Sequence, residues 1–155
     1  MLRTLAFLIL IAAPVAAQTD VGFGGGNHDR SAPVEVAAEN LEVDQSTGQA
    51  VLTGSVVIAQ GDLRLSADRV EVDYSTGAER RIERLVALGN VLIVAGADAA
   101  EGQSATYTLG TSEILLTGDV VVTQAGSTLA GDQLSVNLTS GAGTVSGRVR
   151  TTLQP

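Results

Sequence analysis

The sequence predicts an all-β protein, a rolled or jelly-roll-like sheet built from repeated antiparallel hairpins. Three observations predict this fold. Apolar and polar residues alternate with a period of two, which is the spacing of side chains on one face of a strand. The apolar residues are mainly Val, Leu, Ile and Ala, with only 3% aromatics, and β-branched residues favour strands over helices. One phrase of sequence also recurs along the chain.

The first residues are typical of a secretion signal. Arg3 supplies a positive charge, an apolar run extends from Leu5 to Ala13, and small residues follow Pro14 as far as Ala17. The run is about half as long as the roughly 20 apolar residues that a membrane-spanning helix needs. We therefore expect residues 1–17 to be a signal peptide cleaved after Ala17, and the rest of the chain to be exported.

Residues 18–32 are rich in glycine and poor in apolar residues, which predicts a flexible N-terminal arm. The glycine-rich stretch beginning at Gly22 follows no predicted strand, precedes no helix and contains no Lys, so we interpret it as a linker and not as a phosphate-binding loop. The chain's single histidine, His28, lies in this arm, where nothing in the sequence fixes its geometry.

A repeat organises the following residues. The phrase AENLEVDQSTG, starting at Ala38, matches ADRVEVDYSTG, starting at Ala67, and turn residues end both phrases. A glycine two residues before an apolar residue recurs at Gly54, Gly89, Gly118 and Gly147. The second unit is longer, with its extra residues around 78–84. Such self-similarity is typical of tandem structural units, so we expect residues 33–153 to form one domain of hairpin units with about a dozen or more short strands.

A change of parity inside the units predicts bent strands. Leu63, Leu65 and Ala67 share one face of a strand, whereas Val70 falls on the opposite count. A slip of one residue turns every later side chain to the other face, so we predict a bulge or bend near residues 39–40 and 68–69. Bent strands indicate a sheet rolled into two walls around an apolar interior, with a three-sided β-solenoid as the competing geometry.

Composition argues against several classes of function. The 17 acidic and 9 basic residues give a net charge of −8, which repels the backbone of a nucleic acid. There is no cysteine, hence no disulfide and no thiolate metal site. With one histidine and singly scattered carboxylates, which we expect to bond local backbone near turns, we predict no catalytic residues, no metal site and no cofactor.

The segment from Ala38 to Asp73, AENLEVDQSTGQAVLTGSVVIAQGDLRLSADRVEVD, carries one complete unit into the next. It resembles the OstA-like repeat of the LptA family, and the resemblance covers about residues 33–153. That resemblance implies an open, twisted β-jellyroll in the periplasm that holds the acyl chains of lipopolysaccharide. It also implies head-to-tail self-association into a bridge between inner-membrane and outer-membrane transport components, with no enzymatic reaction.

Two sets of residues are candidate binding positions. Arg80, Arg81 and Arg84 form the one basic cluster of the sequence, in the lengthened loop, where arginine side chains can bind a phosphate; a solvated loop tip is the other interpretation. Apolar positions of period two are candidates for the inward, lipid-shielding face: Leu41, Val43, Val56, Ile58, Leu65, Val70, Val72, Val91, Ile93, Val120, Val122, Leu134 and Val136.

Two alternatives share the same repeats. A structural β-solenoid that polymerises would have a sealed core and no affinity for lipid. A soluble relative within the family, such as the periplasmic portion of another bridge component, is the nearer alternative.

Overall fold

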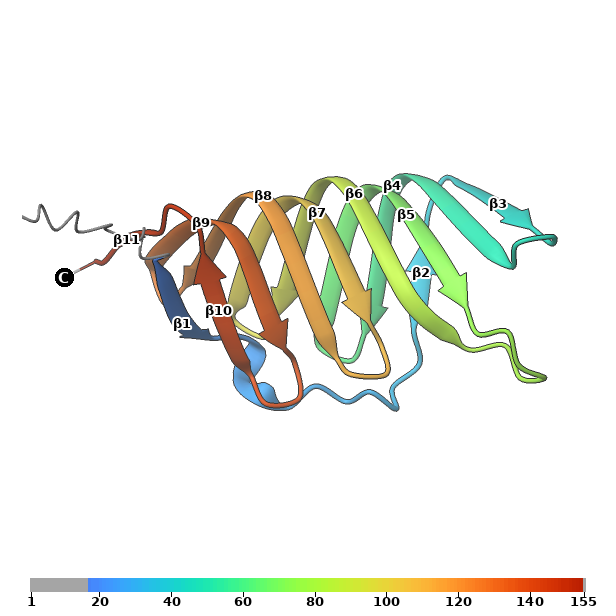
Figure 1. The fold of residues 1–155 in the computed structure, drawn as a ribbon, viewed down its shortest axis with the longest axis horizontal. Coiled ribbons are helices and arrows are strands. Elements are labelled where there is room, and N and C mark those ends of the chain that lie inside the picture. The colour runs from blue at the N-terminus through green and yellow to red at the C-terminus, as the bar shows by residue number, and fades with distance from the viewer. Residues whose placement is uncertain (1–16, 155) are drawn as a thin grey trace, which may run out of the picture.

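The computed structural model describes residues 17–154, so the predicted secretion signal, apart from Ala17, lies outside the described residues. The strands form one 11-stranded sheet, and this confirms the predicted all-β class. In chain order the elements are β1 (Gln18–Gly22), the short 3-10 helix η1 (Gly24–Gly26), β2 (Glu35–Ala37), β3 (Asn40–Asp44), β4 (Gln49–Gln60), β5 (Leu63–Tyr74), β6 (Ile82–Ala95), β7 (Asp98–Thr108), β8 (Glu113–Gln124), β9 (Ser127–Asn137), β10 (Ala142–Ser146) and β11 (Arg150–Thr152) (Figure 1).

Neighbouring strands pair antiparallel in the order β1-β10-β9-β8-β7-β6-β5-β4-β2. β3 also pairs with β4, and β11 with β9. The predicted hairpin repeat is therefore present. The lengthened unit also falls as predicted, because the loop between β5 and β6 spans residues 75–81 whereas β7 and β8 are joined by residues 109–112. Within residues 17–154 no helix has the length and apolar character needed to cross a membrane.

The long strands bend where the sequence predicts a change of parity. Between β4 and β5 the register jumps, so that Gly54 and Ser55 stand opposite the single residue Asp68. Gly54 and Ser55 have φ angles of 82° and 45°. Two residues facing one is the definition of a β-bulge, which bends its strand. The bulge predicted near residues 68–69 is confirmed, with the extra residue on the partner strand.

Glycine is required at these bulges by space as well as by backbone angle. A Cβ atom built on Gly89, where φ is +80°, would lie 2.6 Å from a carboxylate oxygen of Asp68. A Cβ atom at Gly54, Gly118 or Gly147 would likewise clash with a neighbouring side chain, that of Glu39, Gln103 or Asp132 respectively. The glycine that marks each repeat in the sequence is therefore the residue at which each unit turns the corner, on β4, β6 and β8 and between β10 and β11.

Polar side chains join neighbouring strands at these corners. The side-chain amide of Asn90 donates to Asp68 at 2.7 Å, and the guanidinium of Arg148 donates to Asp132 at 2.6 Å. The expectation that the scattered carboxylates bond local backbone near turns is therefore wrong for Asp68 and Asp132, which lie inside strands and bond to side chains of the next bulge. Asp44 does follow the expectation, since it accepts from the backbone N–H of Ser46.

The bulges divide the sheet into two walls. Wall 1 contains β1, β3, β10 and the halves of the long strands that pair through residues such as Leu52, Val70 and Leu134. Wall 2 contains β2, β11 and the other halves, which pair through residues such as Ile58 and Ile93. The bulges on β4, β6 and β8 shift the register of every strand pair from β4 to β9 at one level, so the roll has two walls and not the three of the competing solenoid. The strands are fewer and longer than expected because each continues through the corner.

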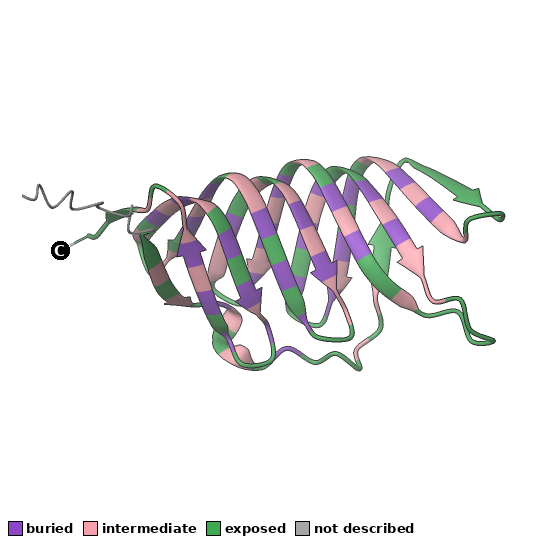
Figure 2. Cartoon of the chain, viewed as in Figure 1, coloured by how far each residue is buried: buried purple, intermediate pink, exposed green. Residues whose placement is uncertain are grey.

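The core lies between the two walls. Buried and exposed residues alternate along every long strand (Figure 2), and the buried aliphatic side chains of both walls form one cluster. Alternation of period two, which the sequence already shows, thus places one face of each wall in the interior and the other in solvent.

Residues 18–32, expected to be a flexible arm, are instead part of the fold. β1 pairs with β10, with Gln18 opposite Ser146 and Gly22 opposite Ala142. From there the chain runs along the open edges of the roll to β2 at the other end (Figure 1). Phe23 and His28 are buried. The pairing partner of β1 is more than a hundred residues away in sequence, and no local sequence pattern predicts this pairing.

Candidate functional site

Eleven of the thirteen apolar residues predicted to face inward are buried in the interior. All eleven are exposed by 3% or less, and they come from both walls and from every long strand except β7. Together they form a continuous aliphatic interior that runs the length of the roll. The eleven are Val56, Ile58, Leu65, Val70, Val72, Val91, Ile93, Val120, Val122, Leu134 and Val136.

Leu41 and Val43, predicted to belong to the same inward set, are exposed by 61% and 55%. Their strand pairs place them opposite Leu52 and Ala50, which are buried. Residues directly opposite in an antiparallel pair point to the same face, so Leu41 and Val43 do lie on the interior face. They are uncovered because β3 is the last strand of wall 1.

The two walls have free edges that face each other. The edge of wall 1 consists of hairpin loops, among them residues 109–112 and 138–141, and the edge of wall 2 consists of the tight turns at residues 61–62, 96–97 and 125–126. Residues 23–34, which we call the strap, run between these edges. The strap therefore closes the side of the roll.

Hydrogen bonds tie the strap to both walls. The backbone N–H of Phe23 donates to the carbonyl of Gly141 at 2.8 Å, and Arg30 donates to the carbonyl of Gly110 at 2.7 Å, both on wall 1. On wall 2, the N–H of Gly24 donates to Asp98 at 2.9 Å. The strap thus bridges two edges that do not pair with each other.

Three buried side chains meet under the strap: His28 from the strap, Gln60 from the end of β4 in wall 2, and Tyr107 from β7 in wall 1. We call them the latch. The Tyr107 hydroxyl donates to Oε1 of Gln60 at 2.8 Å, and Nε2 of His28 lies 2.9 Å from the hydroxyl and 3.0 Å from the same Oε1. The latch therefore joins both walls and the strap.

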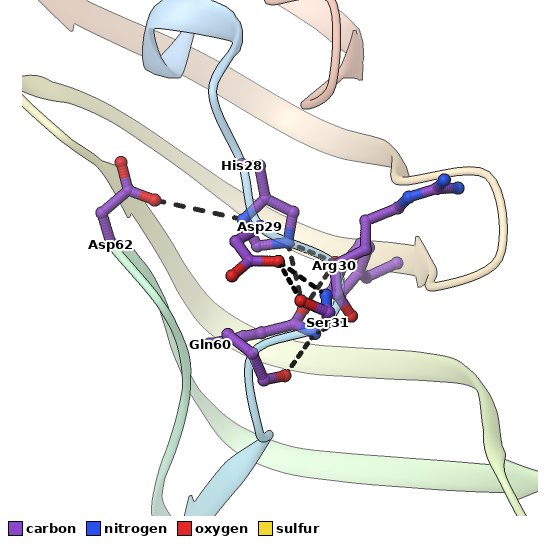
Figure 3. A network of polar contacts seen from close by, with 8 residues as sticks. His28, Asp29, Arg30, Ser31, Gln60 and Asp62 are labelled. Carbon is purple, nitrogen blue, oxygen red and sulfur yellow. Dashed lines mark hydrogen bonds and ion pairs between the residues drawn. The ribbon is translucent and has the colours of Figure 1, made fainter.

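The orientation of Gln60 is fixed by the strap's backbone. Its amide nitrogen donates to the carbonyls of Arg30 and Ala32, both at 3.1 Å (Figure 3). The oxygen of the amide must then face His28 and Tyr107 as an acceptor. The arrangement is complete when Nε2 of His28 carries the ring proton and donates.

Burial governs the electrostatics of the latch. It raises the pKa of Tyr107 to about 12, because the phenolate would lose its hydration among aliphatic side chains. The phenol therefore stays protonated at neutral pH and acts as a donor. Nδ1 of His28 has no hydrogen-bond partner among the described residues, although Asp62 Oδ1 lies 4.0 Å away (Figure 3).

Sequence reasoning missed these residues as a site. Gln60 carries a weak signal, because it continues the inward parity of Val56 and Ile58 at the end of a strand. Phe23 is one of only two phenylalanines in the chain and stands alone among glycines, yet its side chain is almost fully buried. His28 has no sequence neighbour that predicts its burial.

The predicted basic cluster is found in and beside the loop of residues 75–81, but its members differ in their partners. Arg84 pairs with Asp73 at 2.6 Å and lowers the pKa of that carboxyl through hydrogen bonding. Arg81 pairs with Glu79 at 2.7 Å. The guanidinium of Arg80 lies 5.7 Å from the ring centre of Tyr74, which is a cation–π distance.

A surface cavity of about 540 Å³ lies at the end of the strap nearest β1. It is lined by residues of the strap and of both wall edges, including Phe23, Asp98, Gln124 and Gly141. Elsewhere in residues 17–154, no group of three or more His, Cys, Asp or Glu side chains is arranged to hold a metal ion.

These features define a class of protein. It is a periodic β-jellyroll built from tandem hairpins, with an aliphatic interior along its length and uncovered interior-face residues at one end.

The LptA/(LptD N-terminal domain) LPS transport protein family matches residues 35–142 of this chain, and the chain belongs to that family. The predicted resemblance is thereby confirmed.

Two individual proteins are similar to this chain in sequence. The chain is 27% identical over 157 residues to an uncharacterized protein of Rhizobium meliloti (strain 1021), covering 95% of this chain and 84% of the relative. It is 26% identical over 113 residues to the lipopolysaccharide export system protein LptH of Pseudomonas aeruginosa, covering 68% of this chain and 63% of LptH.

The crystal structure of LptH, described as the LptA-homologous periplasmic component of the lipopolysaccharide transport device of P. aeruginosa, has the same fold. It superposes with a TM-score of 0.74 at 21% identity, over 83% of this chain and 99% of that one. The match confirms the predicted open β-jellyroll.

Proposed function

We propose that this chain is a periplasmic carrier of lipopolysaccharide that shields the acyl chains between its two walls during transport from the inner to the outer membrane. One observation carries the proposal: the aliphatic interior is continuous from β4 to β10, contributed by every repeat. Acyl chains are stabilised in such an interior at about 25 cal/mol per Å2 of apolar surface removed from water. Membership of a lipopolysaccharide transport family supports it.

The periplasmic location rests on two independent supports. The sequence begins with a segment typical of a secretion signal, for which cleavage after Ala17 is the expected processing. The related LptH is described as a periplasmic component. No cofactor and no catalytic group enter this proposal, because moving a lipid along an apolar surface requires no covalent chemistry.

The ends of the roll support head-to-tail association with a second copy or with inner-membrane and outer-membrane transport components. At one end, β2 and β3 are terminal strands, and Val36, Leu41 and Val43 expose apolar side chains on the interior face. At the other end, β1 and β11 are terminal. Strand addition between such ends would continue both walls and the apolar interior.

The basic cluster offers a contact for the phosphates of lipopolysaccharide. Among its members Arg80 is the best placed, because Arg81 and Arg84 already pair with carboxylates, whereas Arg80 forms no ion pair with the described residues and lies over the ring of Tyr74. The cluster lies on the edge of wall 1, where a headgroup would remain in water while its acyl chains enter.

Photocrosslinking of lipopolysaccharide tests the proposal. A photoreactive residue is placed at Ile58 or Val72, both buried in the interior, and in matched proteins at Gln45 or Thr111, both exposed. Adducts confined to Ile58 and Val72 are expected.

The rival function is a structural polymer without lipid binding. The nearly complete burial of the inner side chains favours this alternative. A folded protein that forms no adduct at any of the four positions would establish a sealed core and discard the carrier proposal.

A further inference from the structure

The interior is closed on all sides along the middle of the roll. Away from the end strands, the inward apolar residues of both walls are exposed by 9% or less, so the walls pack against each other and leave no uncovered apolar channel along the side. Interiors are packed about as densely as organic crystals. An acyl chain therefore enters only if some part of the enclosure moves.

The strap is attached to the walls without the strand pairing that joins the other parts of the enclosure. Neighbouring long strands are joined by ladders of ten or so paired residues, whereas the strap carries no strand pairing between Phe23 and Val34. It is attached by isolated hydrogen bonds to Gly141, Asp98 and Gly110, by the buried side chain of Phe23 and by the latch. Moving the strap breaks few bonds and leaves every ladder of the two walls intact.

Both ends of the strap are anchored in the sheet, so displacement does not release the chain. β1 holds one end on wall 1, and β2 holds the other on wall 2. The three glycines of η1, with φ angles near +70°, supply backbone freedom close to the first anchor. This arrangement suits a segment that swings out and returns.

The latch consists of polar side chains, although buried aliphatic side chains would stabilise the closed position of the strap more. His28, Gln60 and Tyr107 bury a ring nitrogen, an amide and a hydroxyl under the strap, and within residues 17–154 Nδ1 of His28 has no hydrogen-bond partner. A buried polar atom without a partner loses its hydration and gains no hydrogen bond in return. The strap therefore covers the interior with less net stabilisation than aliphatic side chains of the same volume would give.

We propose that the strap, residues 23–34, is a displaceable side closure, and that acyl chains enter or leave the interior between the wall edges when the latch of His28, Gln60 and Tyr107 opens. This inference rests on the proposed lipid-carrying function. It adds a lateral route, distinct from passage through the ends of the roll. The headgroup would then lie along the edges, in solvent.

A removable cross-link tests the closure directly. A Cβ atom built on Gly61 lies 4.0 Å from Cβ of Ala32, which is within the 3.5–4.5 Å range for a disulfide. The chain has no cysteine of its own, so A32C/G61C forms one defined bridge. The bridge ties the strap to wall 2 beside the amide of Gln60, and its formation is verified by mass before lipid is added.

The readout is binding of fluorescently labelled lipopolysaccharide to the oxidised and the reduced protein. Uptake is expected to fall by about tenfold or more in the oxidised form, because the competent open state is removed, and to recover on reduction. The single variants A32C and G61C, in the same oxidant, are the controls. G61C shows whether a side chain at Gly61, where φ is +59°, disturbs the protein by itself. Both are expected to keep wild-type uptake.

The outcomes separate the two proposals. Equal uptake by oxidised and reduced A32C/G61C, with wild-type uptake intact, overturns the side closure and leaves entry through the ends. No uptake by the wild-type protein overturns the carrier function itself, and the closure with it.

Discussion

The hydroxyl of Tyr107 and the side-chain oxygen of Gln60 are 2.8 Å apart, and this hydrogen bond joins the two walls of the roll directly. The two residues belong to strands that do not pair with each other, since β4 and β7 are separated in the sheet by β5 and β6. Their contact exists only because the bulges fold the sheet back on itself.

Alkaline pH should weaken this contact. The pKa of Tyr107 is raised by burial from 10.0 to about 12, so the stability that its protonated form contributes is complete below pH 10.0 and is lost as the pH rises toward about 12. Tyr107→Phe should cost about 1 kcal/mol at neutral pH through the lost hydrogen bond, and should flatten the alkaline decline. Urea unfolding across this range measures both effects. Tyr74→Phe, at the only other tyrosine, should leave the decline in place.

The repeated glycines of the bulges should be intolerant of substitution. Gly89→Ala places a Cβ atom 2.6 Å from the Asp68 carboxylate and forces a non-glycine residue to φ +80°, so unfolding free energy should fall by about 1–3 kcal/mol. Gly77→Ala is the matched control, because nothing lies within 4 Å of its Cβ position, and it should change stability by less than about 0.5 kcal/mol. Denaturant midpoints of the two variants should not coincide.

Acid should release the ion pair beside the long loop. Hydrogen bonding from Arg84 and Gln49 lowers the pKa of Asp73 below its ordinary value of 3.8. The stability gained from Asp73 is therefore present above pH 3.8 and lost as the pH falls through the lower pKa of the folded state. Asp73→Asn should be less stable near neutrality and less sensitive to acid, measured by thermal unfolding at a series of pH values. Glu113→Gln, at an exposed carboxylate of β8, should keep the acid sensitivity of the wild type.

Self-association should depend on the uncovered residues of β3. Leu41→Asp puts a charge on the interior face at the end of the roll, where a second copy would have to bury it, so association should weaken by about tenfold or more, equivalent to about 1.4 kcal/mol. Sedimentation velocity over a concentration series gives the constant. Leu115→Asp is the matched control, because it makes the same substitution at an exposed leucine (41% exposed) that lies on the outer face of β8. It should leave association unchanged. Equal weakening by both variants would argue against association through this end.

The repeat made much of this fold predictable. The period of two assigned faces correctly from Val56 to Val136, and the change of parity after Ala67 located a bulge, because both signals depend on residues adjacent in the chain. The same logic gave the face of Leu41 correctly but not its exposure. Parity determines which face a side chain occupies, whereas burial depends on whether another strand lies beyond it.

The strap and the latch lay beyond the reach of such reasoning. His28 and Gln60 are 32 residues apart in sequence, and Tyr107 lies 79 residues from His28. No period relates them, since the strap has no regular structure of its own to impose one. Only the closure of the roll brings them together, and that closure is a property of all the repeats jointly.

Each repeat carries its own bulge, its own corner glycine and its own hairpin, so the architecture contains a rule for changing size. Deleting or duplicating a whole unit would remove or add two strands, and with a spacing of about 4.8 Å per strand would change the length of the roll by about 10 Å. The terminal strands would be unaffected. Evolution of this chain can thus adjust how far one molecule reaches in discrete increments while leaving its joints with neighbours unaltered, and the strap, which must span the same length, would have to change in step.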